Sequence, residues 1–135
     1  MAEQDVRWKQ RHENFKKSVA NLSEALSTTA PNKLEKQGII KAFELAYELA
    51  WKTLQDYLAA LGYGDVVGPK PVIRRAFESG VISNGDLWNE MHQARNESAH
   101  IYDEQKADNL EGRIRQDFIL PLSKLADSLE ARADE

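Results

Sequence analysis

Cysteine is absent from the 135-residue sequence. Disulfide bonds, thiolate zinc sites and cysteine nucleophiles are therefore excluded. Long hydrophobic runs are absent too. No segment approaches the length that a bilayer-spanning helix needs, and the first residues, MAEQDVRWKQRHENF, contain no apolar core of signal-peptide length. From these absences we expect a soluble cytoplasmic protein that does not enter a membrane.

The sequence also lacks an excess of positive charge, because 18 lysines and arginines face 22 aspartates and glutamates, for a net charge of −4. This balance argues against a broad electrostatic surface for nucleic acid, but not against a small local site. No stretch interleaves aromatic and basic residues as extended single-strand binding sites do. Metal-ligand spacing, a glycine-rich phosphate loop and the nucleotide-binding motif of a nucleotidyltransferase are missing. We therefore expect no metal and no cofactor, and the chain is not itself a nucleotidyltransferase.

The residues that are present indicate one helical domain over residues 1–135. The composition, 41% hydrophobic and 30% charged, is typical of a globular chain whose length suits a single domain. No segment alternates as a strand does. Apolar residues instead recur at steps of three and four, the period of a helix. A first stripe contains Trp8, His12, Phe15, Val19, Leu22 and Leu26, and a second contains Ile40, Phe43, Tyr47, Ala50, Leu54, Leu58 and Leu61.

The second helix is expected to be long and to carry apolar residues over a wide arc. It runs from about residue 32 to 61, roughly 45 Å at 1.5 Å per residue, and Pro31 suits its first turn. A helix that is apolar over a wide arc needs cover on two sides. It therefore either forms the centre of the bundle or also lines a subunit interface. The apolar positions off its main stripe are Ile39, Ala46, Leu49 and Thr53.

Two shorter helices follow the long one. The segment PKPVIRRAFESG predicts a helix of about two turns, entered through Pro71 and stopped by Gly80. Ser83 is expected to cap the next helix, with Asp86 as its capping-box partner. We expect the helix capped by Ser83 to fray between Ser98 and Ile101.

A last helix completes an antiparallel bundle of four main helices and one short helix, an all-α fold. Asp103 and Glu104 are expected to begin it, where carboxylates complement the helix dipole. Pro121 predicts a kink, or a break just before it. The acidic tail at about 130–135 is expected to fray. The stripe of this helix contains Leu110, Ile114, Phe118, Leu122, Leu125 and Leu129.

Polar side chains gather in one stretch, RNESAHIY, near the expected end of the helix that Ser83 caps. Because successive helical residues rotate by about 100°, Asn96 and His100 share a face, as do His92 and Arg95. Arg95 and His100 diverge by roughly 140°. They can meet at one small target only if the helix ends or loosens between them, or if two copies of the chain face each other. Spacing alone favours a plainer interpretation, in which both residues complement the dipole and cap terminal carbonyls.

The same stretch resembles the signature of the HEPN superfamily, an arginine followed by a polar residue and, after four to six intervening residues, a histidine. The continuation to Tyr102 matches the Arg-x4-His-x-Tyr form of the HepT-like toxins. The likeness covers roughly residues 8–125. It includes LEKQGIIKAFELAYELAWKTLQDYL, PVIRRAFESGVI and LWNEMHQARNESAHIYDE, which look like the nucleotidyltransferase substrate-binding branch of the superfamily.

This resemblance implies a dimeric helical bundle whose two Arg-His motifs meet at a shared cleft that takes RNA or a nucleotide. It also implies a partner, a minimal nucleotidyltransferase (MNT) encoded beside the helical protein and bound to it. Some HEPN members are metal-independent endoribonucleases, and in HepT-like pairs the partner acts as antitoxin by transferring AMP to the motif tyrosine, here Tyr102. An older interpretation of the family has the helical protein present a substrate to the transferase.

The motif residues suit RNA cleavage without a metal. His100 would act as base or acid near neutral pH, and Arg95 would stabilise the phosphorane-like transition state with directional hydrogen bonds. Asn96 would orient the imidazole or bind a phosphate oxygen. In a dimer the two copies of His100 would divide the roles of base and acid. His92 is a candidate to flank the cleft, with an ordinary surface role as the more common alternative.

Other polar residues carry weaker expectations. His12 is expected to pack, partly buried, in the first stripe, and Glu44 and Glu48 to lie on a solvated face. Arg74 and Arg75 are candidate RNA contacts, on a slight signal. Two functions remain open. One is an endoribonuclease toxin neutralised by its MNT partner, and the other is a non-catalytic subunit that docks on the nucleotidyltransferase.

Overall fold

Helices make up the regular secondary structure in the computed structural model, which describes residues 3–100 and 102–135. No strand occurs in these two ranges, so the expected all-α class is confirmed. The last expected helix consists of two α-helices joined through a π-helical turn. The elements are α1 (Glu3–Leu26), α2 (Lys33–Ala60), α3 (Pro69–Glu78), α4 (Gly85–Glu97), a 3₁₀ turn (Ser98–His100), α5 (Glu104–Arg113), the π turn (Ile114–Phe118) and α6 (Ile119–Ala133).

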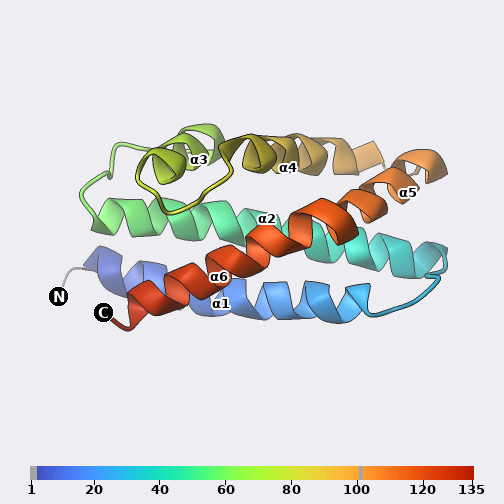
Figure 1. Ribbon diagram of the computed structural model, residues 1–135, viewed down its shortest axis with the longest axis horizontal. Helices are drawn as coiled ribbons and strands as arrows, with labels where there is room; N and C mark the ends of the chain where they lie inside the picture. The colour runs from blue at the N-terminus through green and yellow to red at the C-terminus, as the bar shows by residue number, and fades with distance from the viewer. Residues whose placement is uncertain (1–2, 101) are drawn as a thin grey trace.

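Helix α2 is the centre of the bundle (Figure 1). It runs antiparallel to α1 along one side, α3 and α4 lie along its other side, and α5 and α6 form a bent rod that crosses from α4 to α1 (Figure 1). Each of the other five α-helices contacts α2. The neighbouring helices of α2 therefore account for its wide apolar arc. This agrees with the first of the two alternatives, in which the helix forms the centre of the bundle.

The core follows the predicted stripes. At its middle, the rings of Phe43 and Phe118 are both fully buried and stack with their centroids 5.5 Å apart. Off the main stripe of α2, Ile39, Ala46 and Thr53 are buried as well. The last residues of the first two stripes are less buried, since Leu26 is half-buried and Leu61 is exposed.

Helix α2 begins at Lys33 because Asn32 caps it. The Asn32 side chain accepts the backbone N–H of Glu35 at 2.8 Å, and the Glu35 carboxylate accepts the Asn32 N–H at 2.8 Å. This reciprocal capping box fixes the cap at Asn32. The expectation that Pro31 lies in the first helical turn is therefore wrong, because Pro31 precedes the cap.

Helices α3 and α4 also begin at other residues than expected. Helix α3 starts at Pro69, not at Pro71, because Gly68 before it adopts a φ of +92°, which glycine tolerates at little cost. The cap of α4 is Asn84, not Ser83: the Asn84 side chain accepts the N–H of Leu87 at 3.0 Å. Asp103 does cap α5, by accepting the N–H groups of Gln105 and Lys106.

Pro121 lies inside α6, and the backbone adapts just before it. In the π turn Ile114–Phe118, the N–H of Ile119 bonds to the carbonyl of Ile114. Widening the helix here suits a proline that cannot donate a hydrogen bond and whose ring crowds the carbonyl four residues earlier. The interruption agrees with the expected break before Pro121.

The C-terminal segment does not fray from residue 130 as expected. Helix α6 continues to Ala133. Glu130 lies 2.7 Å from the Lys16 ammonium, and Arg132 donates to the Tyr57 hydroxyl at 3.0 Å. These contacts bind the last turns of α6 to α1 and α2, which the composition of the tail alone does not reveal.

His12 makes the stability of this part of the bundle sensitive to pH. It is 1% exposed, and its Nε2 lies 3.2 Å from the Glu130 carboxylate. Burial, and secondarily the charge of Lys16, lower the pKa of His12 below its ordinary value of 6.5, while Glu130 opposes this effect. Burial also lowers the pKa of His92. The unfolded chain therefore binds protons more readily than the folded chain as the pH falls through 6.5.

We expect the free energy of unfolding to decrease as the pH is lowered from 7 through 6.5 toward the folded-state pKa of His12. In His12→Gln this decrease should be smaller, because a glutamine does not titrate, and His92 should supply what remains. Chemical denaturation at several pH values measures the effect. An equal decrease in His12→Gln and wild type would contradict it.

Candidate functional site

The RNESAH motif spans the end of α4. Arg95 lies in the last turn, the α-helix ends at Glu97, and Ser98–His100 form a 3₁₀ turn. The helix therefore ends between Arg95 and His100, which is one of the two conditions under which these side chains could approach a common target. Ile101, the position between His100 and Tyr102, lies outside the described residues.

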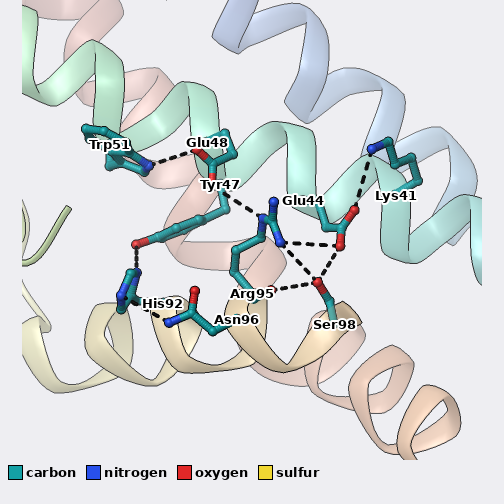
Figure 2. Close-up of polar contacts among 9 residues, drawn as sticks. All are labelled: Lys41, Glu44, Tyr47, Glu48, Trp51, His92, Arg95, Asn96 and Ser98. Atoms are coloured by element: carbon teal, nitrogen blue, oxygen red, sulfur yellow. Dashed lines mark hydrogen bonds and ion pairs between the residues drawn. The ribbon is translucent and has the colours of Figure 1, made fainter. Parts of the chain in front are cut away.

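Arg95 points toward α2, where two carboxylates bind it (Figure 2). Its Nη1 lies 3.5 Å from Glu44, and its Nε lies 3.3 Å from Glu48. The contact with Glu48 is an ion pair and lacks hydrogen-bond alignment, because Nε has no hydrogen-bond partner among the described residues. Lys41 approaches Glu44 at 3.7 Å. The two negative charges of Glu44 and Glu48 are thus balanced by the positive charges of Arg95 and Lys41.

Ser98 completes this cluster, which we call the Arg95 clamp (Glu44, Glu48, Arg95 and Ser98). Arg95 Nη1 donates to the Ser98 hydroxyl at 3.4 Å, and that hydroxyl contacts both the Glu44 carboxylate and the Arg95 carbonyl oxygen, the latter at 2.6 Å. Ser98 is buried. It therefore ties the 3₁₀ turn to α2 and fixes where the helix stops.

The expectation that Glu44 and Glu48 lie on a solvated face is wrong. The Glu44 side chain is mostly buried and Glu48 is partly buried, because both face Arg95 across the α2–α4 contact. Their spacing of four residues was the available signal, since it places two carboxylates on the face that meets α4. Ser98 gave no comparable signal, being one of several small polar residues at a helix end.

His92 and Asn96 form a second polar group on the same face of α4 (Figure 2). The Tyr47 hydroxyl lies 2.8 Å from His92 Nδ1, and the Asn96 amide nitrogen lies 3.4 Å from His92 Nε2. Asn96 can donate to Nε2 only if the ring is neutral and carries its hydrogen on Nδ1, facing Tyr47. Burial and the nearby charge of Lys70 lower the pKa of His92, which agrees with a neutral ring.

The structure thus places Asn96 against His92, whereas the sequence had paired it with His100. Burial also raises the pKa of the Tyr47 phenol, so Tyr47 remains protonated at neutral pH. His92 is held by two neighbours and is not an isolated surface residue. It lies between the Arg95 clamp and the N-terminal half of α4.

His100 and Tyr102 are exposed beyond the end of α4. The Tyr102 hydroxyl lies 3.2 Å from His100 Nδ1, and the two rings meet edge to face with centroids 5.7 Å apart. Tyr102 is 77% exposed, an unusual position for a ring that normally packs on the protein. His100 also lines a pocket of about 350 Å³ between α4 and α5, together with Lys106 and Arg113. Arg95 is not among the residues that line it.

A single chain therefore does not bring Arg95 and His100 into one pocket. Within residues 3–100 and 102–135, no three histidine, aspartate or glutamate side chains gather as metal ligands would. None of the helices in the described part of the chain combines the length and apolar character needed to cross a membrane.

An antiparallel helical bundle that carries an Arg-x4-His-x-Tyr motif at the end of a helix has the defining features of a HEPN protein. Comparison with known families identifies the branch. Residues 10–131 match the model of the family described as nucleotidyltransferase substrate binding protein like. The chain belongs to this family, in the HepT-like branch of the HEPN superfamily.

Individual relatives agree with this assignment. The chain is 32% identical over 99 residues to the probable ribonuclease HepT of Haemophilus influenzae, an alignment that covers 70% of the chain and 67% of that protein. A crystal structure of a Thermus thermophilus protein superposes with a TM-score of 0.75 at 28% identity, covering 90% of this chain and 99% of that one.

A second solved structure shows the same fold. It comes from Haemophilus influenzae and was described as revealing the fold of a substrate-binding domain of a nucleotidyltransferase. It superposes with a TM-score of 0.64 at 24% identity, covering 93% of this chain and 98% of the other.

Proposed function

We propose that this protein is the toxin of a toxin–antitoxin pair, a metal-independent endoribonuclease that cleaves RNA at a dimer cleft with Arg95 and His100. A nucleotidyltransferase partner neutralises it and transfers AMP to Tyr102. The relative named as a probable ribonuclease and the family name that refers to a nucleotidyltransferase support the two halves of this proposal.

The observation that carries the proposal is that the guanidinium of Arg95 is held on one side and, within the described part of the chain, unbound on the other. A guanidinium has five N–H donors in a fixed plane. Nη1 and Nε face Glu44, Glu48 and Ser98, whereas Nη2 has no partner among the residues that the structure describes. The clamp thus fixes the orientation of the group and leaves donors free for a phosphate oxygen, which is the arrangement that preorganised charge stabilisation requires.

His100 supplies the proton chemistry. One imidazole removes the proton from the 2′-hydroxyl, the resulting oxygen attacks the adjacent phosphorus, and the bond from phosphorus to the 5′-oxygen breaks. A second imidazole donates a proton to that leaving oxygen. The products are a 2′,3′-cyclic phosphate and a free 5′-hydroxyl. His100 is exposed and lies just beyond the end of α4, so a second copy of the chain can provide the second imidazole.

The dimer that this chemistry needs is predicted to form through α2 and the end of α4. Leu34 and Leu45 are 75% and 51% exposed on the outward side of α2, and Leu45 directly follows the clamp residue Glu44. Light scattering should give twice the chain mass of 15.3 kDa. Leu45→Glu should shift the population toward monomer, because it places a charge on an apolar contact.

Leu120→Glu is the matched control, because Leu120 is 57% exposed on α6. This variant should remain dimeric. A wild-type monomer at micromolar concentration, or equal dissociation of both variants, would contradict the predicted interface.

One observation favours the second function, a non-catalytic subunit that docks on the nucleotidyltransferase. The charge of the Arg95 guanidinium is already balanced, because the carboxylates of Glu44 and Glu48 together offset Arg95 and Lys41. A clamp of this kind also stabilises a fold. In that case Tyr102, exposed and beside His100, is still available as an acceptor for the transferase.

Expression with and without the nucleotidyltransferase separates the two functions. If the protein is a toxin, expression alone should arrest growth, and co-expression should restore it. The purified protein should cleave single-stranded RNA in the presence of EDTA. Normal growth together with intact RNA would leave the docking subunit as the function.

A further inference from the structure

A groove lies between α3, the segment that joins α3 to α4, and the first turns of α4. Its volume is about 970 Å³. Lys70, Arg74, Arg75 and Phe77 of α3 line one wall, and Asn84 and Asn89 line the other. Three basic side chains thus gather here in a chain whose net charge is −4.

Two of these cations are available to a ligand. Lys70 and Arg74 lie one turn apart on the exposed side of α3 and form no ion pair or side-chain hydrogen bond with any residue that the structure describes. Arg75 is already engaged, since it stacks on the Tyr63 ring at 4.6 Å and lies 4.0 Å from Glu78. Glu78 and Asp86 are the two acidic side chains among the residues that line the groove.

Phe77 adds an aromatic surface to these cations. Its side chain is 50% exposed and packs on Gly85 at the start of α4, where an added Cβ would lie 3.3 Å from the ring. A half-exposed ring beside free cations suits single-stranded nucleic acid, because bases stack on aromatic faces while phosphates pair with lysine and arginine. The sequence carries only a slight signal here, at Arg74 and Arg75. Lys70, Arg74 and Phe77 are three or four residues apart along the chain and come together only on one side of the folded helix.

The walls of the groove are fixed by the fold. The Gly68 N–H donates to the Gln55 side chain of α2 at 2.8 Å, which anchors the start of α3. Gly80, at a φ of +77°, ends α3 in a turn where the N–H of Val81 bonds to the carbonyl of Ala76 at 2.9 Å. The groove therefore exists before any ligand binds.

Beyond the groove, polar side chains lead along one side of α4 toward the Arg95 clamp. Asn89, His92 and Asn96 follow one another at intervals of three and four residues, so they form a polar stripe. Lys70 is close enough to His92 for its charge to contribute to the lowered pKa of that imidazole. From Asn89 to Arg95 the helix rises by about 9 Å, a distance that a few nucleotides of an extended strand cover.

We propose that the α3–α4 groove binds the single-stranded RNA next to the scissile phosphodiester, with Lys70 and Arg74 on phosphates and Phe77 stacked on a base. The proposal rests on the proposed function for the identity of the ligand. The polar stripe places this RNA segment on the path to Arg95.

Binding of a fluorescein-labelled single-stranded RNA to the His100→Ala protein tests this groove without cleavage. In that background, Lys70→Ala with Arg74→Ala should weaken binding about tenfold and reduce the salt slope by about 1.4, which is 0.7 for each of two phosphate contacts. Phe77→Leu should weaken binding up to about tenfold and leave the salt slope unchanged, because stacking releases no counterions. The control is Lys17→Ala with Lys124→Ala, which removes the same charge from positions on α1 and α6 outside the groove and should bind RNA normally.

The outcomes separate the groove from the catalytic proposal. RNA binding that depends on the groove, without cleavage by the wild type, would overturn the proposed catalysis and keep the groove. Cleavage by the wild type, with groove variants that bind like the control, would overturn the groove. If the variants instead lose their complex with the nucleotidyltransferase and bind RNA normally, the surface belongs to that protein. A protein that neither binds nor cleaves RNA would refute both proposals.

Discussion

His100→Ala should lower RNA cleavage by about 10² to 10⁴-fold, the usual contribution of a general acid–base group. We assign the acid–base role to His100 because its imidazole is exposed at the end of α4. The imidazole of His92, in contrast, is held by Tyr47 and Asn96. The loss should appear in kcat and leave RNA affinity nearly unchanged. Cleavage of a labelled RNA under single-turnover conditions, with EDTA present, measures it.

Arg95 variants extend the same prediction. Arg95→Ala should reduce cleavage on the scale of His100→Ala, and Arg95→Lys should recover little. A lysine ammonium is a point charge, and it cannot meet Glu44 and Glu48 while also directing donors toward a phosphate, as the planar guanidinium does. Rescue of activity by Arg95→Lys would show that only charge is needed.

His12→Gln is the control for these variants. It replaces another histidine, one that is buried against α6, and should cleave RNA at the wild-type rate near neutral pH. Full activity in His100→Ala, or activity that disappears with EDTA, would refute the mechanism.

Tyr102→Phe should abolish AMP transfer to this protein. The wild type, incubated with the nucleotidyltransferase, ATP and magnesium, should gain the mass of one or more AMP units. The Tyr102 hydroxyl is the favoured acceptor because it is exposed and lies 3.2 Å from His100 Nδ1. An attached AMP would put a bulky base and a negative phosphate beside the motif, excluding RNA by volume and by charge.

Tyr63→Phe is the matched control for labelling, because Tyr63 lies under Arg75 and away from the motif. It should be labelled like the wild type in intact-mass spectrometry. Tyr102→Phe should keep its fold and resist inhibition by catalytic amounts of the transferase, though tight stoichiometric binding would still inhibit it. Undiminished labelling of Tyr102→Phe would exclude this tyrosine as the acceptor.

Periodicity in the sequence predicted most of the fold, because a helix core depends on spacing. The stripes through Phe43 and Phe118 are buried as expected, except at Leu61, which is exposed, and Leu110, which is partly buried. Helix starts were less predictable, because neighbouring residues compete for the same role. Asn84 prevails over Ser83 as a cap, and Pro69 over Pro71 as a first helical residue.

The candidate site was predictable only in part. The motif located Arg95, His100 and Tyr102, and the structure puts all three at the end of α4 or just beyond it. The partners of Arg95 were not predictable in the same way. Glu44 and Glu48 are about fifty residues away in sequence, and only the packing of α4 on α2 shows that they face a guanidinium.

The central position of α2 limits how this protein can evolve. Glu44 and Glu48 of the clamp alternate along α2 with Phe43, Tyr47 and Ala50 of the core. Inserting or deleting one residue in this helix would rotate the carboxylates by about 100° relative to the core. Length changes near α2 are therefore expected in its flanking connections, at residues 27–32 and 61–68, and the part of the site on α2 can diversify only by substitution within a fixed helical frame.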